Sequence, residues 1–251
     1  MKGPSLDIDL IVVRLQDLIS KRTYKFNETY NQIIEMQGLH NFLNFKGEIL
    51  LSLIMKDRII PNLNPERYSE AIHLLKPNSF TTVDGETYES DFDCARAELE
   101  RITRENDELL KLAPEFKPVG LVKGCSEKTI ENHAKQLKTK GIDELIFHVS
   151  DFSRHGKPVM IKRARLYSRK IRPHAKNLML YGLGSPNLFN QFCFADRYVT
   201  LTHYVTAMKG KKFTGCKTMK YSGGCNEEII TKNFDNIHNI IKSMEHQKKL
   251  S

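Results

Sequence analysis

The chain has no apolar run long enough to cross a membrane. Its longest runs, IDLIVVRL and EILLSLIM, are far shorter than the roughly 20 residues that a transmembrane helix needs. The first residues, MKGPSLDID, do not place an apolar core before small residues, so we expect no secretory signal. These features predict a cytoplasmic protein without a membrane partner.

Regularly spaced cysteines are also missing. The five cysteines are an odd number, which favours reduced thiols over a disulfide framework. Cys216, Cys225 and His238 invite a zinc interpretation. The two cysteines are nine positions apart, however, whereas structural zinc sites usually pair cysteines about two to four residues apart. We therefore predict that the chain has no cofactor, with zinc as a disfavoured alternative.

The glycine-rich corner before Pro186 lacks the residues of the known phosphate loops. Gly182-Leu183-Gly184-Ser185 has neither the third glycine of a dinucleotide fingerprint nor the lysine of a P-loop. A helix N-terminus after such a corner favours anions, so Gly182 and Gly184 are candidates for phosphate binding. A tight turn that lets the helix pack is the equal alternative. Neither a Ser/His/Asp nor a Cys/His nucleophile arrangement follows from the residue spacing.

Acidic residues are fewer than basic ones, 30 against 39, which gives a formal net charge of +9. Such an excess favours a polyanionic partner through neutralisation of phosphates. Many of the basic residues fall into two clusters: Lys162, Arg163, Arg165, Arg169, Lys170, Arg172 and Lys176, and then Lys209, Lys211, Lys212, Lys217 and Lys220. We interpret the clusters as a surface that follows a tRNA or DNA backbone. The alternative is the solvated surface of an ordinary basic protein.

Three segments share the order of strand, corner and helix. KPVGLVKG, DELIFHVSD and NLMLYGLG are apolar runs of strand type, and each ends in polar or glycine-rich residues before a helix. Serial units of this kind build a parallel sheet. The 251 residues, 40% of them hydrophobic, fit one barrel domain of roughly 250 residues. The predicted fold is α/β: a (β/α)8 TIM-like barrel, incomplete or irregular, with an N-terminal helical segment.

The prediction divides the chain after residue 45. Residues 1–45 form a helical segment that packs on the barrel, although Ile8–Leu15 could also be a strand, and residues 46–251 form the barrel. Barrel strands are predicted at Glu48–Ile54, Ser79–Asp84, Val119–Lys123, Leu145–Val149, Leu178–Tyr181 and Tyr198–Leu201. Helices are predicted from Pro65 with Asn64 as the cap, at 93–112, 126–140, 159–171 and 227–249, and at Ser185–Phe194 with Ser185 as the cap.

Polar residues at the carboxyl ends of these strands are the candidate site, because parallel sheets carry their chemistry there. Asp84 follows an apolar run and precedes Gly85; its carboxylate could act as nucleophile or general base, or bind a base or sugar. The alternative is a turn aspartate that bonds its own backbone. Lys123, followed by Gly124, could bind a ligand phosphate or form a salt bridge to Asp84 or Asp151.

A second polar group follows the strand predicted at Leu145–Val149. Asp151 is a candidate catalytic carboxylate, and Arg154 and His155 are candidates to bind a base or phosphate. A structural ion pair or a helix cap in the loop is the equal alternative. His203, after the last predicted strand, completes the candidate base- or phosphate-binding residues.

The order of these motifs resembles the tRNA-guanine transglycosylase superfamily, including its relatives that insert 7-deazaguanines into DNA. FTTVDGETY (Phe80–Tyr88) resembles the family strand whose aspartate recognises a purine-like base, and PVGLVKG resembles the strand that usually ends in Val-Gln-Gly. LMLYGLGSPNLFNQFCFADRYVT and YVTAMKGKKFTG resemble the family's Gly-x-Gly corner and the basic segment after it. The likeness covers roughly residues 64–242. It implies a (β/α) barrel, base exchange through a covalent carboxylate intermediate, and often a zinc site near the C-terminus.

The chain departs from the family where the chemistry lies. By this matching, Val199 stands in place of the nucleophilic aspartate, and valine can neither attack an anomeric carbon nor hold a proton. ILLS at Ile49–Ser52 replaces an Asp-Ser-Gly corner, and Lys123 replaces the base-contacting glutamine. The zinc cysteines are not reproduced, and Asn226 matches the position of their histidine.

Two main hypotheses follow. In the first, the chain is a transglycosylase-like nucleic-acid-binding protein, a non-catalytic or diverged subunit in tRNA or DNA 7-deazaguanine modification. Its partner would be an active transglycosylase-like subunit or a second copy. In the second, it is an active pentosyltransferase on a nucleobase or nucleoside that uses Asp84 and Asp151. Val199 favours the first, and the polar strand ends favour the second. A third hypothesis, a barrel enzyme for a phosphorylated sugar, rests on the glycine corner alone.

Overall fold

The computed structural model describes residues 9–87, 92–153, 158–200, 208, 211–214, 217–220 and 227–250. The chain divides into two compact units. We call them the N-terminal unit, Ile8–Ile146 with His174–Lys176, and the C-terminal unit, which contains Phe147–Pro173 and Asn177–Ser251. The division falls inside a strand rather than in a linker, so a break in composition does not mark it.

The strands form a parallel sheet in chain order. They are β1 (Leu10–Arg14), β2 (Glu48–Ser52), β3 (Ser79–Thr81), β4 (Lys117–Val122), β5 (Glu144–His148), β6 (Asn177–Tyr181) and β7 (Arg197–Val199). The sheet order is β1-β2-β3-β4-β5-β6-β7, and β1–β2, β2–β3, β3–β4 and β6–β7 pair in parallel. Each strand of the sheet lies beside the next strand along the chain, and helices occur between the strands. This is the pattern of a TIM-like barrel. The predicted α/β class is confirmed, in an irregular form whose main sheet has seven strands in the described part of the chain.

The helical prediction for residues 1–45 is wrong at its first element. Leu10–Arg14 is β1, which pairs with β2 from Leu10 opposite Glu48 to Arg14 opposite Ser52. The strand alternative for this stretch therefore holds, and the first strand of the sheet lies inside the predicted N-terminal segment. Apolar periodicity led to the wrong prediction here because β1 continues directly into a 3-10 helix at Leu15–Leu18. The apolar run therefore mixes the period of a strand with that of a helix.

Short helices complete this region of the N-terminal unit. An isolated antiparallel bridge joins Ile19 to Phe26, and α1 (Glu28–Glu35) and α2 (Leu39–Leu43) follow. Asn27 caps α1 by accepting a hydrogen bond from the amide of Tyr30.

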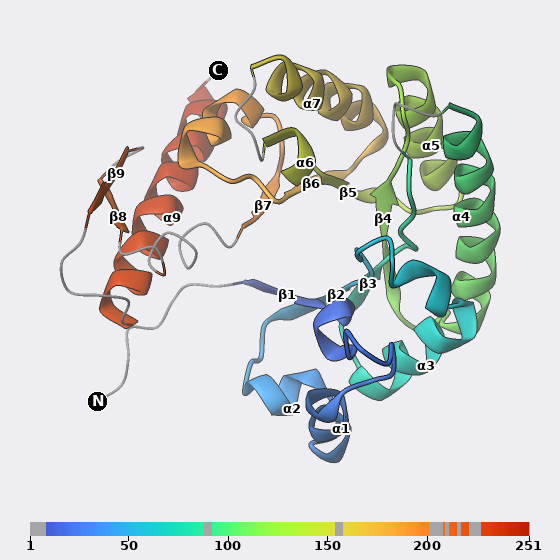
Figure 1. Ribbon diagram of the computed structural model, residues 1–251. Helices are drawn as coiled ribbons and strands as arrows, with labels where there is room; N and C mark the ends of the chain where they lie inside the picture. Colours follow the sequence, from blue (N-terminus) through green and yellow to red (C-terminus); the bar gives the residue numbers. More distant parts are fainter. Residues whose placement is uncertain are drawn as a thin grey trace. The chain divides into compact units, whose positions relative to one another are not determined.

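Helices α3 (Pro65–Leu75), α4 (Phe92–Leu112) and α5 (Glu127–Thr139) follow β2, β3 and β4 (Figure 1). Asn64 caps α3 through the amide of Arg67, with Pro65 in the first turn, as predicted. Ser126 and Thr129 form a reciprocal capping box at the start of α5. These caps fix where each helix begins and therefore where the preceding strand ends.

The core of the N-terminal unit packs these helices on the strands. Ile49, Leu50 and Leu51 of β2 and Phe80 of β3 are fully buried, and Ile72 of α3 packs into the same core. Strands buried on both faces read as continuous apolar runs, which is why Ile49, Leu50 and Leu51 of β2 show no alternation. This packing holds the carboxyl ends of β2, β3 and β4 in place.

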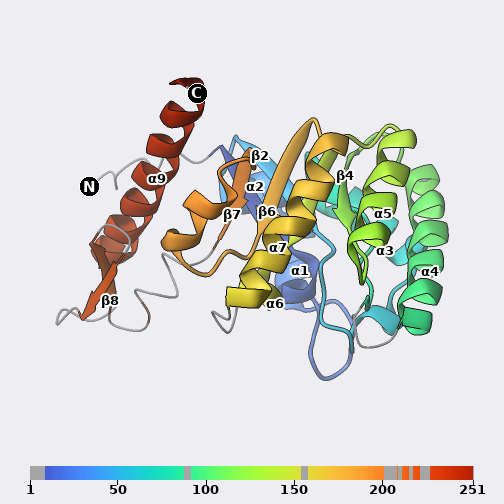
Figure 2. The same ribbon diagram turned by 90° about the horizontal axis from the view of Figure 1, so that it is seen from above.

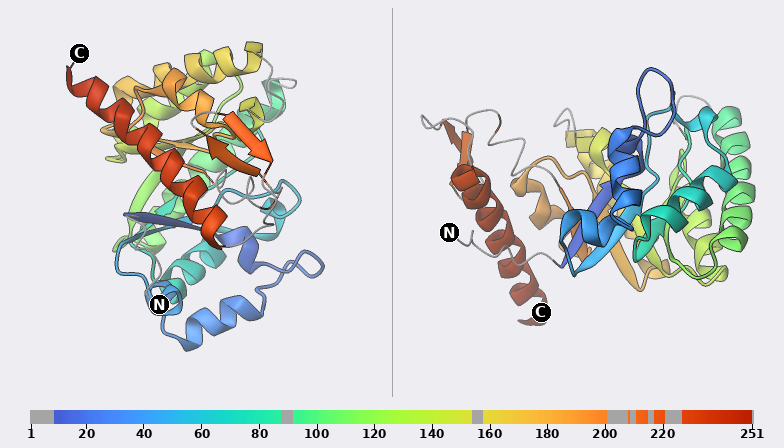
Figure 3. Two further views of the ribbon diagram at one scale, coloured as in Figure 1. Left: turned by 90° about the vertical axis from the view of Figure 1, so that its left-hand side faces the viewer. Right: turned by 90° about the horizontal axis from the view of Figure 1, so that it is seen from below.

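The C-terminal unit contains α6 (Ser150–Ser153), α7 (Pro158–Ile171), a 3-10 helix at Pro186–Phe192 and α9 (Glu227–Leu250). Strands β8 (Lys211–Thr214) and β9 (Lys217–Lys220) pair as an antiparallel hairpin beside α9 (Figures 2 and 3). Pro186 starts the 3-10 helix as predicted, but Ser185 makes no capping hydrogen bond with its side chain. Among the described helices, none has the length and apolar character to cross a membrane.

Candidate functional site

Asp84 and Lys123 meet at the carboxyl ends of neighbouring strands. Asp84 lies three residues beyond the end of β3, and Lys123 directly follows β4. Nζ of Lys123 is 2.9 Å from Oδ1 of Asp84. The side chains are only 18% and 6% exposed. Of the partners predicted for Lys123, the structure selects the salt bridge to Asp84.

The remaining hydrogen-bonding capacity of the Asp84 carboxylate is also used by the backbone. Oδ2 accepts from the amide of Met55, at 2.9 Å, and Oδ1 accepts from the amide of Gly85, at 2.8 Å. The turn-aspartate interpretation is therefore correct in part, because Asp84 does bond the next residue. Three donors hold one buried carboxylate, so the group is satisfied as an anion within the protein.

Helix α4 adds a second layer of charge around Asp84. The guanidinium of Arg101 donates to the carbonyl of Asp84, at 3.0 Å, and forms ion pairs with Glu98 and Glu105 on its own helix. The hydrogen bond from Arg101 lowers the pKa of the Glu98 carboxyl, and the same contact raises the pKa of Arg101. Glu98 and Arg101 therefore stay charged at neutral pH, and Arg101 holds Asp84 through its backbone carbonyl.

His133 of α5 fixes Lys123 from the other side. Nδ1 of His133 accepts a hydrogen bond from the backbone amide of Lys123, at 3.0 Å. Burial lowers the pKa of His133 to about 4, so the imidazole is neutral at physiological pH. Gly124 donates to the hydroxyl of Thr87, at 3.3 Å, and a Cβ on Gly124 would lie 2.7 Å from the amide nitrogen of Ile130. The backbone after β4 is thus held closely against the start of α5.

In the C-terminal unit, the candidates after β5 are only partly described. Asp151 lies in the short helix α6, directly after Ser150, and its side chain is outside what the structure describes. Arg154, His155 and His203 lie outside the described residues. Ser150 itself contacts His148, with 2.5 Å between its Oγ and Nε2 of the imidazole. The end of β5 is polar, as predicted. The polar side chains that the structure describes there, those of His148 and Ser150, were not among the candidates from the sequence.

The glycine corner after β6 is a tight turn. Gly182 has a φ of +91°, and a Cβ there would lie 2.7 Å from Cβ of Ser150. The amide of Gly182 donates to the carbonyl of Val199, and the hydroxyl of Thr200 donates to the carbonyl of Leu183. The geometry supports the turn interpretation at Gly182, while nothing in the described contacts of Gly184 selects phosphate binding.

Five residues of the first basic cluster lie on α7, and Arg172 and Lys176 follow its end. Lys162, Arg165 and Arg169 are exposed at positions i, i+3 and i+7, which share one face of the helix. The guanidinium of Arg169 lies over the ring of Phe194, 5.8 Å from its centroid, and Arg172 pairs with Asp196. Of the second cluster, Lys211, Lys212, Lys217 and Lys220 lie in the β8–β9 hairpin, and Lys209 is outside the described residues.

No group of three or more His, Cys, Asp or Glu residues is placed to hold a metal ion in the part of the chain that the structure describes. Cys216 and Cys225 lie outside that part. Nε2 of His238 is buried in α9 without a hydrogen-bond partner among the described residues, and its ring stacks on Phe234. A lone histidine is not a zinc site, and because both cysteines lie outside the described residues, the zinc that the transglycosylase resemblance implies stays an untested prediction.

Several residues of the site were not predicted. Glu98, Arg101 and Glu105 are spaced as one helix face, which predicts that they lie near one another but not that they face Asp84. His133 carried a stronger signal: with Ile130, Ala134 and Leu137 it occupies the buried stripe of α5. A histidine in an apolar stripe needs a polar partner, which here is the amide of Lys123.

Comparison with known proteins leaves the family open. No protein-family model matches the chain, and no curated protein matches it. Among solved structures, it is similar to the copper homeostasis protein CutC from Streptococcus agalactiae, with 14% sequence identity and a TM-score of 0.45. The match covers 68% of this chain and 80% of the other. A similarity at this level carries no inference about the site.

Proposed function

We propose that the chain is a nucleic-acid-binding protein that resembles the tRNA-guanine transglycosylases and acts as a non-catalytic or diverged subunit in tRNA or DNA 7-deazaguanine modification. The observation that carries the proposal is the basic face of α7. Lys162, Arg165 and Arg169 are exposed in one row, and the helix contains no acidic residue. Such a row binds the phosphates of a nucleic-acid backbone with little regard to base sequence.

The distribution of charge along the chain supports a polyanionic partner. Residues 152–226 contain 15 Lys and Arg and a single acidic residue, Asp196. The rest of the chain has 24 Lys and Arg against 29 Asp and Glu, so it is slightly acidic. A surface adapted only for solubility mixes both signs. The net charge of +9 therefore comes from one continuous stretch, which favours phosphate binding over general solubility.

The state of Asp84 supports the non-catalytic part of the proposal. Its oxygens accept from Lys123 and from two backbone amides, so the carboxylate is already engaged in holding the turn. Val199, at the end of β7, stands where the resemblance expects the nucleophile, and its side chain can form no glycosyl ester. The chain would then bind nucleic acid while an active transglycosylase-like subunit performs the exchange.

One observation favours the second hypothesis, an active pentosyltransferase that uses Asp84 and Asp151. Asp84 and Lys123 lie together at adjacent strand ends, which is where barrel enzymes gather their catalytic groups. A substrate anion that drew Lys123 away would leave Oδ1 of Asp84 with the amide of Gly85 as its one remaining donor among the described residues, and so more open to a substrate. This alternative predicts base exchange by the chain alone.

Binding is tested by fluorescence anisotropy with labelled tRNA and labelled duplex DNA over a series of salt concentrations. Changing Lys162, Arg165 and Arg169 to Gln removes three charges from α7, and changing Lys21, Lys128 and Lys135 to Gln removes three exposed charges elsewhere. We expect the α7 variant to lower the slope of log K against log salt by about 2 to 3, with little change in the control. Absence of binding by the native protein, or an equal loss in both variants, would refute the role of α7.

Catalysis is tested by incorporation of radiolabelled guanine or a labelled 7-deazaguanine into tRNA and DNA. The non-catalytic proposal expects no incorporation by the chain alone. Incorporation that disappears in Asp84→Ala and Asp151→Ala, with the fold intact by circular dichroism, would replace it with the enzyme hypothesis. Nucleic-acid affinity should survive Asp84→Ala under either hypothesis, because Asp84 is buried and holds a turn.

A further inference from the structure

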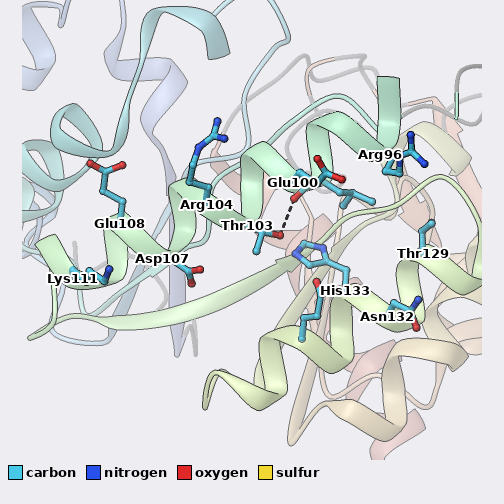
Figure 4. A pocket seen from close by; sticks show the side chains of 12 residues that line it. Arg96, Glu100, Thr103, Arg104, Asp107, Glu108, Lys111, Thr129, Asn132 and His133 are labelled. Atoms are coloured by element: carbon cyan, nitrogen blue, oxygen red, sulfur yellow. Dashed lines mark hydrogen bonds between the residues drawn. The ribbon is translucent and has the colours of Figure 1, made fainter. Parts of the chain in front are cut away.

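The groove between α4 and α5 in the N-terminal unit has a volume of about 880 Å³ (Figure 4). This is the size of a small-molecule site, roughly 300 to 1,000 Å³. Its charged lining is balanced in sign, with three basic and three acidic residues: Arg96, Arg104 and Lys111, and Glu100, Asp107 and Glu108. The lining therefore favours no class of ligand. A more specific arrangement of reactive side chains lies in the C-terminal unit, at the carboxyl ends of β5 and β6.

His148 and Ser150 form a hydrogen-bonded pair at the carboxyl end of β5. His148 is the last residue of β5, and Ser150 is the first residue of α6. Oγ of Ser150 lies 2.5 Å from Nε2 of His148, within reach of direct proton transfer. Both residues are half-buried, so the pair is neither sealed in the core nor fully solvated. A serine hydroxyl and an imidazole in this contact can act as nucleophile and general base.

The imidazole of His148 is held on the face of the sheet that points away from α7. Phe147, the preceding residue of β5, packs against Tyr167 of α7, with 6.5 Å between the ring centroids. Because successive residues of a strand point to opposite faces, His148 points away from that helix. Tyr181, the last residue of β6, contacts the imidazole edge to face, with 5.3 Å between the centroids. Barrel enzymes place their chemistry at such strand ends.

Gly182 makes room for Ser150 beside this ring. Its φ is +91°, and a Cβ on Gly182 would lie 2.7 Å from Cβ of Ser150. A side chain at position 182 would therefore displace Ser150 from its contact with His148. The tight turn after β6 thus helps to fix the hydroxyl relative to the imidazole.

A second serine–histidine contact, in α3, shows how a purely structural pair differs. Oγ of Ser69 lies 3.3 Å from Nδ1 of His73 and donates its proton to the carbonyl of Leu112, at 3.0 Å. Nδ1 of His73 is also 2.7 Å from the carbonyl of Ser69, which can only accept a hydrogen bond. This nitrogen therefore carries a proton and cannot take another from the serine. The pair at the end of β5 uses the other ring nitrogen and has the shorter distance.

We propose that Ser150 is the nucleophile and His148 the general base of a site that hydrolyses carboxylic esters. In the neutral ring with its proton on Nδ1, Nε2 takes the hydroxyl proton while Oγ attacks the ester carbonyl carbon. The proton passes to the alkoxide, which leaves as an alcohol. Water, deprotonated by the same nitrogen, then cleaves the acyl–serine bond, releases the carboxylic acid and restores the hydroxyl.

This activity goes beyond the proposed function and does not depend on it. Neither the basic face of α7 nor the Asp84–Lys123 pair takes part in the reaction. Loss of nucleic-acid binding would leave the ester chemistry unaffected, and loss of the ester chemistry would leave nucleic-acid binding unaffected.

The nucleophile is tested with a biotinylated alkyl fluorophosphonate, which forms an Oγ–P bond with an activated serine and loses fluoride. We expect the full-length chain to be labelled on Ser150, as located by peptide mass spectrometry. Ser150→Ala should abolish the labelling. His148→Gln keeps a hydrogen-bonding group but cannot take the proton, so it should slow labelling about 100-fold. Ser185→Ala is the matched control, because Ser185 is also half-buried and its side chain caps nothing.

Hydrolysis of p-nitrophenyl acetate tests the whole reaction. We expect the native protein and Ser185→Ala to release nitrophenol at least about tenfold faster than Ser150→Ala. Circular dichroism and urea unfolding check that each variant folds. Absence of labelling in the native protein, an adduct on another residue, or equal hydrolysis by native protein and Ser150→Ala would overturn the proposal. Should Ser150→Ala not fold, the position of the adduct on the native protein decides the question.

Discussion

Nζ of Lys123 lies 2.9 Å from Oδ1 of Asp84 in a position where both side chains are largely buried. Such a pair is asymmetric in its energetics: removing one member leaves a charge without a partner, while removing both leaves none. We expect Asp84→Ala and Lys123→Met each to lower the free energy of unfolding by about 2 to 4 kcal/mol. The double variant should lose less than the two single losses together, as measured by urea unfolding.

The exposed pair Lys117–Glu144 is the control for this cycle. Lys117 is 52% exposed, so Lys117→Met should cost at most about 1 kcal/mol. Strictly additive losses at Asp84 and Lys123 would mean that the two groups stabilise the fold separately. The ion pair would then not be the interaction that holds the carboxyl ends of β3 and β4 together.

His133 makes stability depend on pH. Burial lowers its pKa in the folded protein to about 4, while in the unfolded chain it titrates near 6.5. Between these values the unfolded chain binds more protons, so stability rises with pH across this window and is complete above it. We expect His133 to contribute a loss of up to about 3 kcal/mol as pH falls from 6.5 to 4.

The measurement compares urea unfolding of the native protein and of His133→Asn at pH 7 and at pH 5. Asn keeps an acceptor for the Lys123 amide but does not titrate. The variant should therefore show the weaker dependence on pH. An NMR titration in which His133 protonates near 6.5 in the folded protein would contradict the prediction directly.

Helices and strands could be predicted from the sequence more accurately than the contacts between side chains. Apolar periodicity and caps predicted α3, α4, α5 and α7, because local propensity and tertiary burial agree there. The strand ends likewise predicted Asp84 and Lys123 as neighbours of one edge. The partner of Lys123 stayed open between two aspartates, since it depends on register and rotamer rather than on pattern. For the same reason Arg101 was missed: spacing defines a helix face but not the direction in which that face points.

Ser126 should stabilise the start of α5. Its hydroxyl accepts from the amide of Thr129, and the hydroxyl of Thr129 accepts from the amide of Ser126, at 2.9 Å. Ser126→Ala removes one half of this exchange and leaves an amide of the first turn without its acceptor. We expect a loss of about 1 kcal/mol in urea unfolding. Lys128→Ala, an exposed change in the same turn, should leave the free energy of unfolding nearly unchanged. An equal loss in Lys128→Ala would show that the Ser126 cap does not account for the effect.

Gly182 is required by both its backbone conformation and its neighbour. Its φ of +91° is strained for any side chain, and an added Cβ would lie 2.7 Å from Cβ of Ser150, which cannot rotate away. We expect Gly182→Ala to cost about 2 to 3 kcal/mol in unfolding free energy. Gly141 also has a positive φ, +80°, but nothing lies within 4 Å of an added Cβ. Gly141→Ala should therefore cost only about 1 kcal/mol.

Ser150→Gly separates the two causes at Gly182. Removing the Cβ of Ser150 relieves the closest contact but leaves the backbone strain. Gly182→Ala should therefore lower the free energy of unfolding less in the Ser150→Gly background than in the native protein. No recovery would assign the whole cost to φ. If Gly182→Ala were neutral, the corner after β6 would tolerate a side chain, and the glycine would need another explanation, such as close approach of a ligand phosphate to the backbone.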